Sequence, residues 1–268
     1  MRARKIFKNL PTLSFQELGQ RLGLRVEVWN SRLVIMAPMW RRALSTESVF
    51  CKAVVAAGYL TEQQMKRAAR RYRLGCTSQG GVIYWQTDHQ ERIHDGKIMY
   101  YRPDCHRDKL HHPTWVSALL QQRYQWVDRP KASHCLFGLH LVENKFQFLK
   151  ARMDTDGHGT TVCVVEAEKT AVIMSEWYPQ YVWLATGGLG EVQTEKFRPL
   201  RGHRLILFPD TDPEGKAYQR WYEAARQVEQ QLWWEDSPPI YVSTLLELHA
   251  TAAQKERKID IVDYLFEQ

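Results

Sequence analysis

Several features that define other protein classes are missing from this sequence of 268 residues. Its five cysteines are scattered and form no CxxC pair, which argues against a disulfide framework and against a zinc ribbon. No apolar run approaches the roughly 20 residues needed to cross a bilayer. The basic first residues lead into no apolar core, so we expect no secretory signal and no membrane partner. What remains is the composition of a cytoplasmic globular protein, since 44% hydrophobic and 25% charged residues are ordinary for that class.

Positive charge is concentrated at the front of the chain. The net charge is +7, yet residues 1–75 contain 15 Lys and Arg against 4 Asp and Glu, whereas residues 160–268 contain 11 against 17. A basic front joined to an acidic back is expected when one part of a protein binds a polyanion and another part binds cations. A solvated basic surface is the alternative explanation.

The pattern of apolar residues predicts three regions. Residues 1–75 indicate a basic, mainly helical region with a weak hairpin pattern over 26–36. Residues 76–158 indicate a smaller α+β module, in which two β-prone runs, 81–85 and 97–101, are joined by a turn around residues 94–96 and a linker follows over 153–160. Residues 159–268 alternate continuous apolar runs with helical segments. This alternation predicts an α/β domain with about four parallel strands covered by helices on both faces.

A basic helix is expected near the end of the first region. Thr61 and Gln64 have the spacing of a capping box, and Arg67, Arg70 and Arg71 lie on one face of the helix that follows. Such a face can lie along a phosphate backbone, although a solvated surface would look the same. The full set of nucleic-acid-binding candidates consists of basic side chains from all three regions: Lys66, Arg67, Arg70, Arg71, Lys97, Arg107, Lys109 and Lys169.

Acidic residues follow two of the expected parallel strands. Glu166 ends the run 162–165, whereas Asp210 and Asp212 follow the run 205–208. In open parallel sheets, sites form at the carboxyl ends of the strands. Clustered carboxylates repel one another, and a hard dication with oxygen ligands relieves that repulsion. We therefore expect these three acids to be catalytic residues and ligands of Mg²⁺ or Mn²⁺.

At this point the sequence resembles a known family. Residues 164–171 (VVEAEKTA) and 206–217 (ILFPDTDPEGKA) resemble the two signatures of the Toprim domain, which is shared by DnaG-type bacterial primases, topoisomerases, small nucleases and recombination-repair proteins. The resemblance implies a Rossmann-like Toprim fold, a general acid/base or metal-ligand role for Glu166, and Mg²⁺ binding by Asp210 and Asp212. Gly187 and Gly188 match the glycine turn after the family's second strand.

The resemblance extends upstream and also has a departure. Residues 80–85 and 135–139 are similar to segments that precede this motif in primase cores, and residues 50–268 resemble Toprim proteins of mobile elements in Bacteroidetes. Primases usually have Gly after the motif glutamate, whereas here Ala167, Glu168 and Lys169 follow. Glu168 could adjust the site, and Lys169 could meet a phosphate. Because the usual zinc ribbon is missing, a zinc-ribbon protein or a helicase acting in trans is an expected partner.

Two other patterns have simpler explanations that we favour. Residues 260–265 resemble the acidic segment that closes such domains, but Asp260 is also well placed to cap an amphipathic helix. The group of Cys105, His106, His111 and His112 has no standard zinc spacing, and we expect a polar loop there.

Three functions fit these observations. The first is a Mg²⁺-dependent, primase-like nucleotidyltransferase that acts on single-stranded DNA and nucleotides, in the replication of a mobile element. The second is a Toprim nuclease that cleaves phosphodiesters with the same acids. The third is a DNA-binding replication or mobilisation accessory without turnover.

Overall fold

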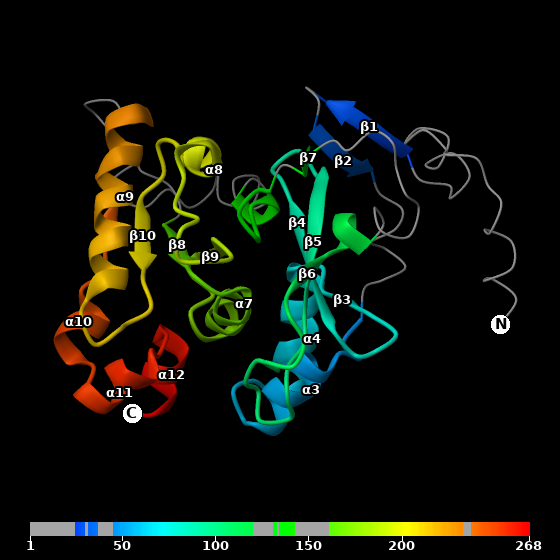
Figure 1. Ribbon diagram of the computed structural model, residues 1–268, viewed down its shortest axis with the longest axis horizontal. Coiled ribbons are helices and arrows are strands. Elements are labelled where there is room, and N and C mark those ends of the chain that lie inside the picture. The colour runs from blue at the N-terminus through cyan, green and yellow to red at the C-terminus, as the bar shows by residue number, and fades with distance from the viewer. Residues whose placement is uncertain are drawn as a thin grey trace, which may run out of the picture.

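The structure is a computed structural model that describes residues 25–29, 32–36, 45–119, 131–132, 134–142, 161–232 and 237–268. Two β-sheets, one mainly antiparallel and one parallel, lie in two halves of the molecule (Figure 1). The expected linker over 153–160 lies outside the described residues. Within the part of the chain that is described, no helix is long and apolar enough to cross a membrane.

The first sheet contains seven short strands from the front and middle of the chain. They are β1 (Arg25–Trp29), β2 (Arg32–Met36), β3 (Gly75–Cys76), β4 (Val82–Thr87), β5 (Ile93–Met99), β6 (Thr114–Trp115) and β7 (Lys131–Ala132). The order is β1-β2-β5-β4-β3, with β6 on β5 and β7 on β2. β1 and β2 form an antiparallel hairpin, which confirms the weak pattern over 26–36.

The hairpin of β4 and β5 is confirmed, but its expected turn around residues 94–96 is wrong. The chain turns earlier, where the Asp88 carboxylate accepts the backbone N–H groups of Gln90 and Arg92, each at 2.9 Å. Gly96 lies inside β5, opposite Trp85. A Cβ atom at Gly96 would lie 2.8 Å from the Trp85 ring, so this glycine permits close packing in a strand and does not mark a turn.

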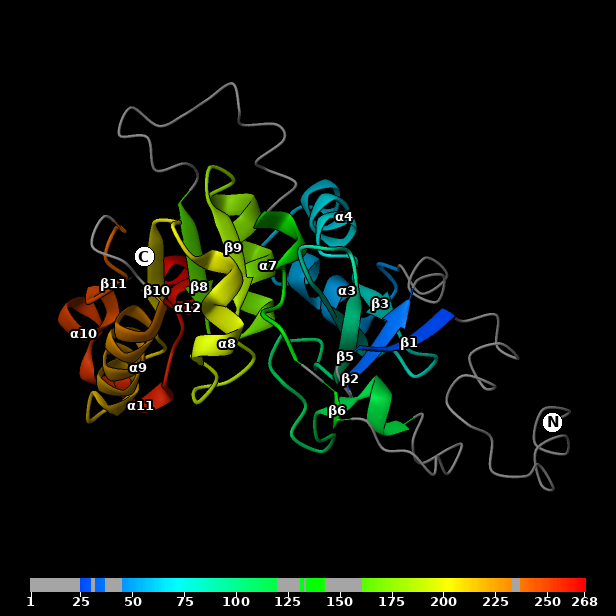
Figure 2. The same cartoon turned by 90° about the horizontal axis from the view of Figure 1, so that it is seen from above.

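Two helices accompany the first sheet. α3 (Val49–Ala56) is capped by Ser48, and α4 (Glu62–Arg71) begins with the expected capping box of Thr61 and Gln64. Met65, Ala68 and Ala69 form the buried face of α4. Figure 2 shows α4 beside α7, at the junction of the two halves.

The second sheet confirms the expected parallel arrangement. Its strands are β8 (Val162–Val165), β9 (Val182–Ala185), β10 (Leu205–Phe208) and β11 (Tyr241–Val242), in the order β11-β10-β8-β9, and all three pairings are parallel. The helical segments between and after them are α7 (Glu168–Trp177), α8 (Thr194–Phe197), the 3₁₀ helix η1 (Arg198–Leu200), α9 (Lys216–Leu232), α10 (Leu245–His249), α11 (Ala252–Arg257) and α12 (Ile261–Phe266).

Helices cover both faces of the parallel sheet. Along β8, Val162 and Val164 pack in the cluster that contains Trp221 of α9, whereas Cys163 and Val165 pack in the cluster with α7. This alternation is the period of two expected for a strand buried on both faces. The continuous apolar runs in the sequence therefore have a direct physical explanation.

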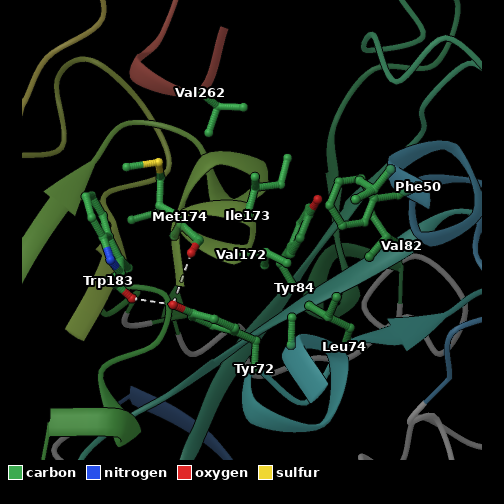
Figure 3. Packing of buried hydrophobic residues seen from close by; sticks show 14 of the residues in the cluster. Phe50, Tyr72, Leu74, Val82, Tyr84, Val172, Ile173, Met174, Trp183 and Val262 are labelled. Atoms are coloured by element: carbon green, nitrogen blue, oxygen red, sulfur yellow. Dashed lines mark hydrogen bonds between the residues drawn. The ribbon is translucent and has the colours of Figure 1, made fainter. Parts of the chain in front are cut away.

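The cluster on the α7 face continues into the first half of the molecule. Phe50, Tyr72 and Tyr84 pack there with residues of α7 and with Trp183 (Figure 3). The Tyr72 hydroxyl donates to the carbonyl oxygens of Trp183 at 2.7 Å and Ala171 at 3.2 Å. One hydrophobic core thus joins the two sheets, while the division of the chain at residues 75/76 and 158/159 stays a prediction.

Candidate active site

The strand order places a topological switch point between β8 and β10. The chain leaves β8 towards β9 on one side, and it leaves β10 towards β11 on the other side. Loops that diverge from adjacent parallel strands open a crevice at the carboxyl ends of those strands. Glu166 directly follows β8, and Asp210 lies two residues after β10, so both acids are placed at this crevice.

A cavity of about 270 Å³ opens between β5 and the loops at this edge. It is lined by Glu166, Glu168 and Asp260, and by the basic side chains Lys97, His106, Arg107 and Lys169. Gly187, Met99, Tyr101, Cys105 and Ala167 complete the lining. The predicted acid Glu166 and three of the predicted nucleic-acid-binding residues therefore surround one space, although they come from both halves of the chain.

Glu166 is partly buried at the edge of this cavity. Burial raises its pKa above the usual range for a glutamate, and the nearby Glu168 carboxylate raises it further. The Lys97 ammonium, the backbone N–H of Leu189 and Arg220 act in the opposite direction. Glu166 therefore binds a proton more readily in this environment than a glutamate exposed to water does.

Lys97 connects the two sheets at the same place. Its Nζ lies 3.0 Å from Oε1 and 3.1 Å from Oε2 of Glu168, and it also donates to the carbonyl oxygen of Gly187 at 2.9 Å. The side chains of Lys97 and Glu168 are 12% and 3% exposed. The sequence suggested that Glu168 adjusts the site, but its partner on β5 could not be read from the local pattern.

Asp210 carries the most perturbed carboxyl of the predicted set. Burial raises its pKa well above the usual range, and the charges of Asp260, Glu166 and Asp263 raise it further, against the opposing effect of Lys169. The charges of three other carboxyl groups therefore act on Asp210 after the end of β10. Asp260 and Asp263 were not among the predicted site residues.

Asp212, the third predicted acid, makes a structural contact. Its Oδ1 accepts the backbone N–H of Glu214 at 2.9 Å, and its Oδ2 accepts that of Ala217 at 2.6 Å. Burial raises the pKa of Asp212, but these hydrogen bonds outweigh that effect and lower it overall. The carboxylate thereby stabilises the turn before α9 and the first turn of that helix.

Asp260 performs the capping role that we favoured and contributes to the acidic site as well. Its Oδ1 accepts the backbone N–H of Asp263 at 2.9 Å at the start of α12, and its Oδ2 accepts the hydroxyl of buried Thr170. The Lys169 ammonium lies 4.0 Å from Asp260 and 3.6 Å from Asp263. These two charges raise the pKa of Lys169 although its burial opposes the change. A helix cap and a site residue have the same sequence pattern, so the sequence could not separate the two roles.

The donor chemistry fits a hard dication, although the side chains do not form a closed metal centre. Within the described part of the chain, no three His, Cys, Asp or Glu side chains gather as a group able to hold a metal ion. However, the negative charges of Asp260, Glu166 and Asp263 each raise the pKa of Asp210, which means that each of these carboxylates repels that of Asp210. Oxygen ligands that repel in this way are the kind that Mg²⁺ and Mn²⁺ relieve.

The other predicted basic residues lie away from the cavity lining or are paired within the chain. Arg67 Nη2 lies 2.7 Å from Oε2 of Glu176, and Arg71 Nη1 lies 3.0 Å from Oε1 of the same carboxylate. Lys66 lies 3.7 Å from Glu62. Arg70 and Lys109 are exposed. Nucleic-acid contact by these five residues stays a prediction, and for Arg67 and Arg71 the structure shows a different partner.

The loop from Tyr101 to His112 is polar, as favoured over a zinc site. Cys105 is buried, whereas His106 and His111 are exposed and lie near Asp104 and Asp108. This loop brings Arg107 and His106 to the mouth of the cavity.

Comparison with known protein families identifies the family of this chain. The model of a family described as a domain of unknown function (DUF6371) matches residues 49–211, which is more than half of the chain. The chain belongs to the DUF6371 family. The matched region includes the residues of β5 and the end of β8 that line the cavity, and it also includes Asp210. A search of curated proteins found no match.

Among solved structures, this DUF6371 protein is similar to DNA primase cores. The primase fragment of the bacteriophage T7 primase-helicase protein has a TM-score of 0.40 at 16% identity, covering 72% of this chain and 63% of that fragment. The DnaG catalytic core has a TM-score of 0.46 at 11% identity, covering 85% and 80%. A DNA primase domain from Pseudomonas aeruginosa has a TM-score of 0.41 at 15% identity, covering 95% and 72%. The chain spans less than two thirds of the T7 fragment.

Proposed function

We propose that this chain is a Mg²⁺- or Mn²⁺-dependent nucleotidyltransferase of the primase type, with a Toprim domain at residues 159–268. Its substrates are nucleotides and single-stranded DNA. The observation that carries the proposal is the cavity at the carboxyl ends of β8 and β9, where Glu166 lies with Lys97, His106, Arg107 and Lys169. Acidic and basic groups lining one space suit a substrate that is itself a phosphate and is handled together with a cation.

The acids would hold the ion, and an exposed basic group such as Arg107 would hold the substrate. We propose Glu166, Asp210 and Asp212 as its ligands; the charges of Glu166 and Asp260 both act on the Asp210 carboxyl, which a dication would relieve. When bound, the ion would neutralise the charge that develops on the transferred phosphate. Arg107 is exposed at the cavity, where it is placed to bind phosphate oxygens. Burial raises the pKa of Glu166, so its carboxylate is a stronger base than that of an ordinary glutamate.

The charge distribution supports a nucleic-acid substrate. The excess of 15 basic over 4 acidic residues in the first 75 positions supplies an attractive field for a polyanion. We propose that basic residues of this region that have no carboxylate partner among the described contacts, such as the exposed Arg70, retain the single-stranded template, and that a zinc-ribbon protein or a helicase acts in trans. The setting we propose is the replication of a mobile element.

A DNA-binding accessory without turnover is the second candidate. The observation that favours it is Asp212, whose two carboxylate oxygens both accept backbone N–H groups at the start of α9. A nuclease would use the same acids as a nucleotidyltransferase, so the two enzymes differ in product and not in site.

The test is to incubate the protein with single-stranded DNA, labelled nucleoside triphosphates and Mg²⁺ or Mn²⁺. Extension products support the proposal, cleavage products support the nuclease, and neither product with intact DNA retention supports the accessory. Asp210→Asn is expected to abolish turnover while leaving DNA retention largely intact. The control is Glu62→Gln, which removes an exposed carboxylate on α4, far from these acids in the sequence. Full turnover by Asp210→Asn would contradict the assignment of Asp210.

A further inference from the structure

The Lys97–Glu168 ion pair joins three elements that meet at the cavity. Lys97 comes from β5 of the antiparallel sheet, Glu168 begins α7, and Gly187 follows β9 of the parallel sheet. The ammonium contacts both carboxylate oxygens of Glu168 and the carbonyl oxygen of Gly187, all within 3.1 Å. The start of α7 and the turn after β9 therefore both contact one side chain of the other sheet.

The hydrogen-bonding capacity of Lys97 is already used. A lysine ammonium has three N–H donors, and three oxygen atoms accept from this one. Only 12% of the side chain is exposed. A phosphate could reach this ammonium only by displacing Glu168, and that would leave a buried carboxylate without its counter-charge. Arg107 differs in this respect, because it is exposed at the same cavity.

The two residues that Lys97 contacts, Glu168 and Gly187, are also the ones that fix the backbone at Glu166. Glu168 lies two residues after Glu166, and the backbone N–H of Gly187 donates to the carbonyl oxygen of Glu166 at 2.9 Å. Gly187 has φ of +86°, and a Cβ atom there would lie 3.2 Å from Oε1 of Glu168. The glycine turn thus packs closely against the ion pair, so movement of one would move the other.

We propose that Lys97 and Glu168 are positioning residues that hold Glu166 in the cavity, and that Lys97 does not bind nucleic acid. The inference rests on the proposed function, because Glu166 is the residue that they position. A catalytic group has to be held within a fraction of an ångström by its supporting contacts, which this ion pair provides from two directions.

The decisive comparison uses Lys97→Met, Arg107→Met and a control, Lys52→Met. Lys52 pairs with Glu47 at 2.9 Å on the surface, with side chains 64% and 72% exposed, so its substitution removes the same charge without touching the cavity. Affinity for single-stranded DNA is measured over a range of salt concentrations. Each lost phosphate contact lowers the slope of log affinity against log salt by about 0.7. We expect that loss for Arg107→Met and no change of slope for Lys97→Met or Lys52→Met.

Turnover in the primer-synthesis assay separates positioning from binding. Lys97→Met and Glu168→Gln are each expected to lower kcat at least tenfold with little change in KM. Because the pair acts as a unit, the kcat of the double variant is expected to be no lower than that of the less active single variant. Glu168→Gln keeps the side-chain size and carries the test if Lys97→Met does not fold. A reduced salt slope for Lys97→Met, or unchanged kcat for both single variants, would overturn the proposal.

A readout without turnover keeps this inference distinct from the proposed function. If the wild-type chain shows no synthesis, hydrogen–deuterium exchange at the Gly187 and Gly188 amides decides the matter. Faster exchange there in Lys97→Met and Glu168→Gln, but not in Lys52→Met, supports the positioning role. Unchanged exchange in both cavity variants would overturn it.

Discussion

At Asp212 the same sequence pattern fits both a metal ligand and a residue that caps a helix. The sequence predicts a metal ligand, because Asp210 and Asp212 follow a parallel strand, whereas in the structure both Asp212 oxygens accept backbone N–H groups before and within α9. A carboxylate that follows a strand and precedes a helix satisfies either pattern. The structure shows the capping contacts, and the metal-ligand role of Asp212 stays a prediction.

The capping role of Asp212 is open to measurement. We expect Asp212→Ala to lower the free energy of unfolding by about 1–2 kcal/mol, the usual cost of removing a helix cap. Glu214→Ala is the matched control, since Glu214 pairs only with Lys216 on the surface in the described contacts and its loss should cost about 0.5 kcal/mol or less. Urea denaturation gives both values. An unchanged stability for Asp212→Ala would show that these hydrogen bonds are not what this residue contributes.

His140 provides a prediction about pH. Burial, followed by the charge of Arg73, lowers the pKa of His140 from 6.5 to about 4. The unfolded chain therefore takes up a proton near pH 6.5 that the folded chain refuses until about pH 4, so this residue makes stability fall as pH is lowered through that window. The loss attributable to it is at most about 3 kcal/mol.

The measurement compares wild type with His140→Gln, which cannot titrate but can still donate to the Arg71 carbonyl oxygen. Denaturation curves at pH 7, 5.5 and 4.5 should show a smaller acid-dependent loss in the variant than in the wild type. Parallel pH profiles for the two proteins would contradict the assignment.

Among the elements, helix α4 separates local from distant causes most clearly. Its capping box and its basic face were readable from the sequence, because these features are local. Its docking onto α7 was not, because Glu176 lies 109 residues from Arg67. A basic face looks the same in sequence whether it meets phosphate, water or a distant carboxylate.

The α4–α7 contact predicts an effect on stability. Glu176 is 3% exposed and pairs with two arginines that are 50% and 31% exposed. Because the arginines remain partly solvated, we expect Glu176→Gln to cost about 1–3 kcal/mol of unfolding free energy, less than a fully buried pair would. Arg70→Met, on an exposed part of the same helix, should change stability by about 0.5 kcal/mol or less. Equal effects of the two substitutions in thermal or urea denaturation would contradict this interface.

For the other elements too, features with a local cause could be predicted from the sequence, and features that depend on distant segments could not. The strands β8, β9 and β10 and the helix α9 were readable because apolar runs and helical stretches alternate along the chain. The turn between β4 and β5 was misplaced because the reason for Gly96 is Trp85 on the neighbouring strand. Of the residues that line the cavity, Glu166, Lys97, Arg107 and Lys169 were predicted as site residues, whereas Asp260 and the pairing of Glu168 with Lys97 depend on segments far apart in sequence.

On the scale of the whole molecule, two sheets with different topology share one core. The cluster that contains Tyr72, Trp183 and Val262 runs from α4 through α7 to α12 (Figure 3). The cavity therefore lies between parts of the chain that pack directly on each other. Basic residues of β5 and the loop that follows it, Lys97, His106 and Arg107, meet acidic residues of the back at that cavity. We assign cation binding to the back and retention of the template mainly to the basic front.

The most direct test of this account is calorimetric titration of Mn²⁺ into the protein in the presence of single-stranded DNA and a nucleoside triphosphate. We predict saturable uptake by the wild-type chain, a loss of affinity of at least tenfold in Asp210→Asn and Glu166→Gln, and unchanged uptake in the surface control Glu62→Gln. The same DNA and nucleotide mixture without protein sets the baseline. Uptake that is absent in the wild type, or equal in wild type and Asp210→Asn, would contradict the claim that these strand-end carboxylates hold a cation.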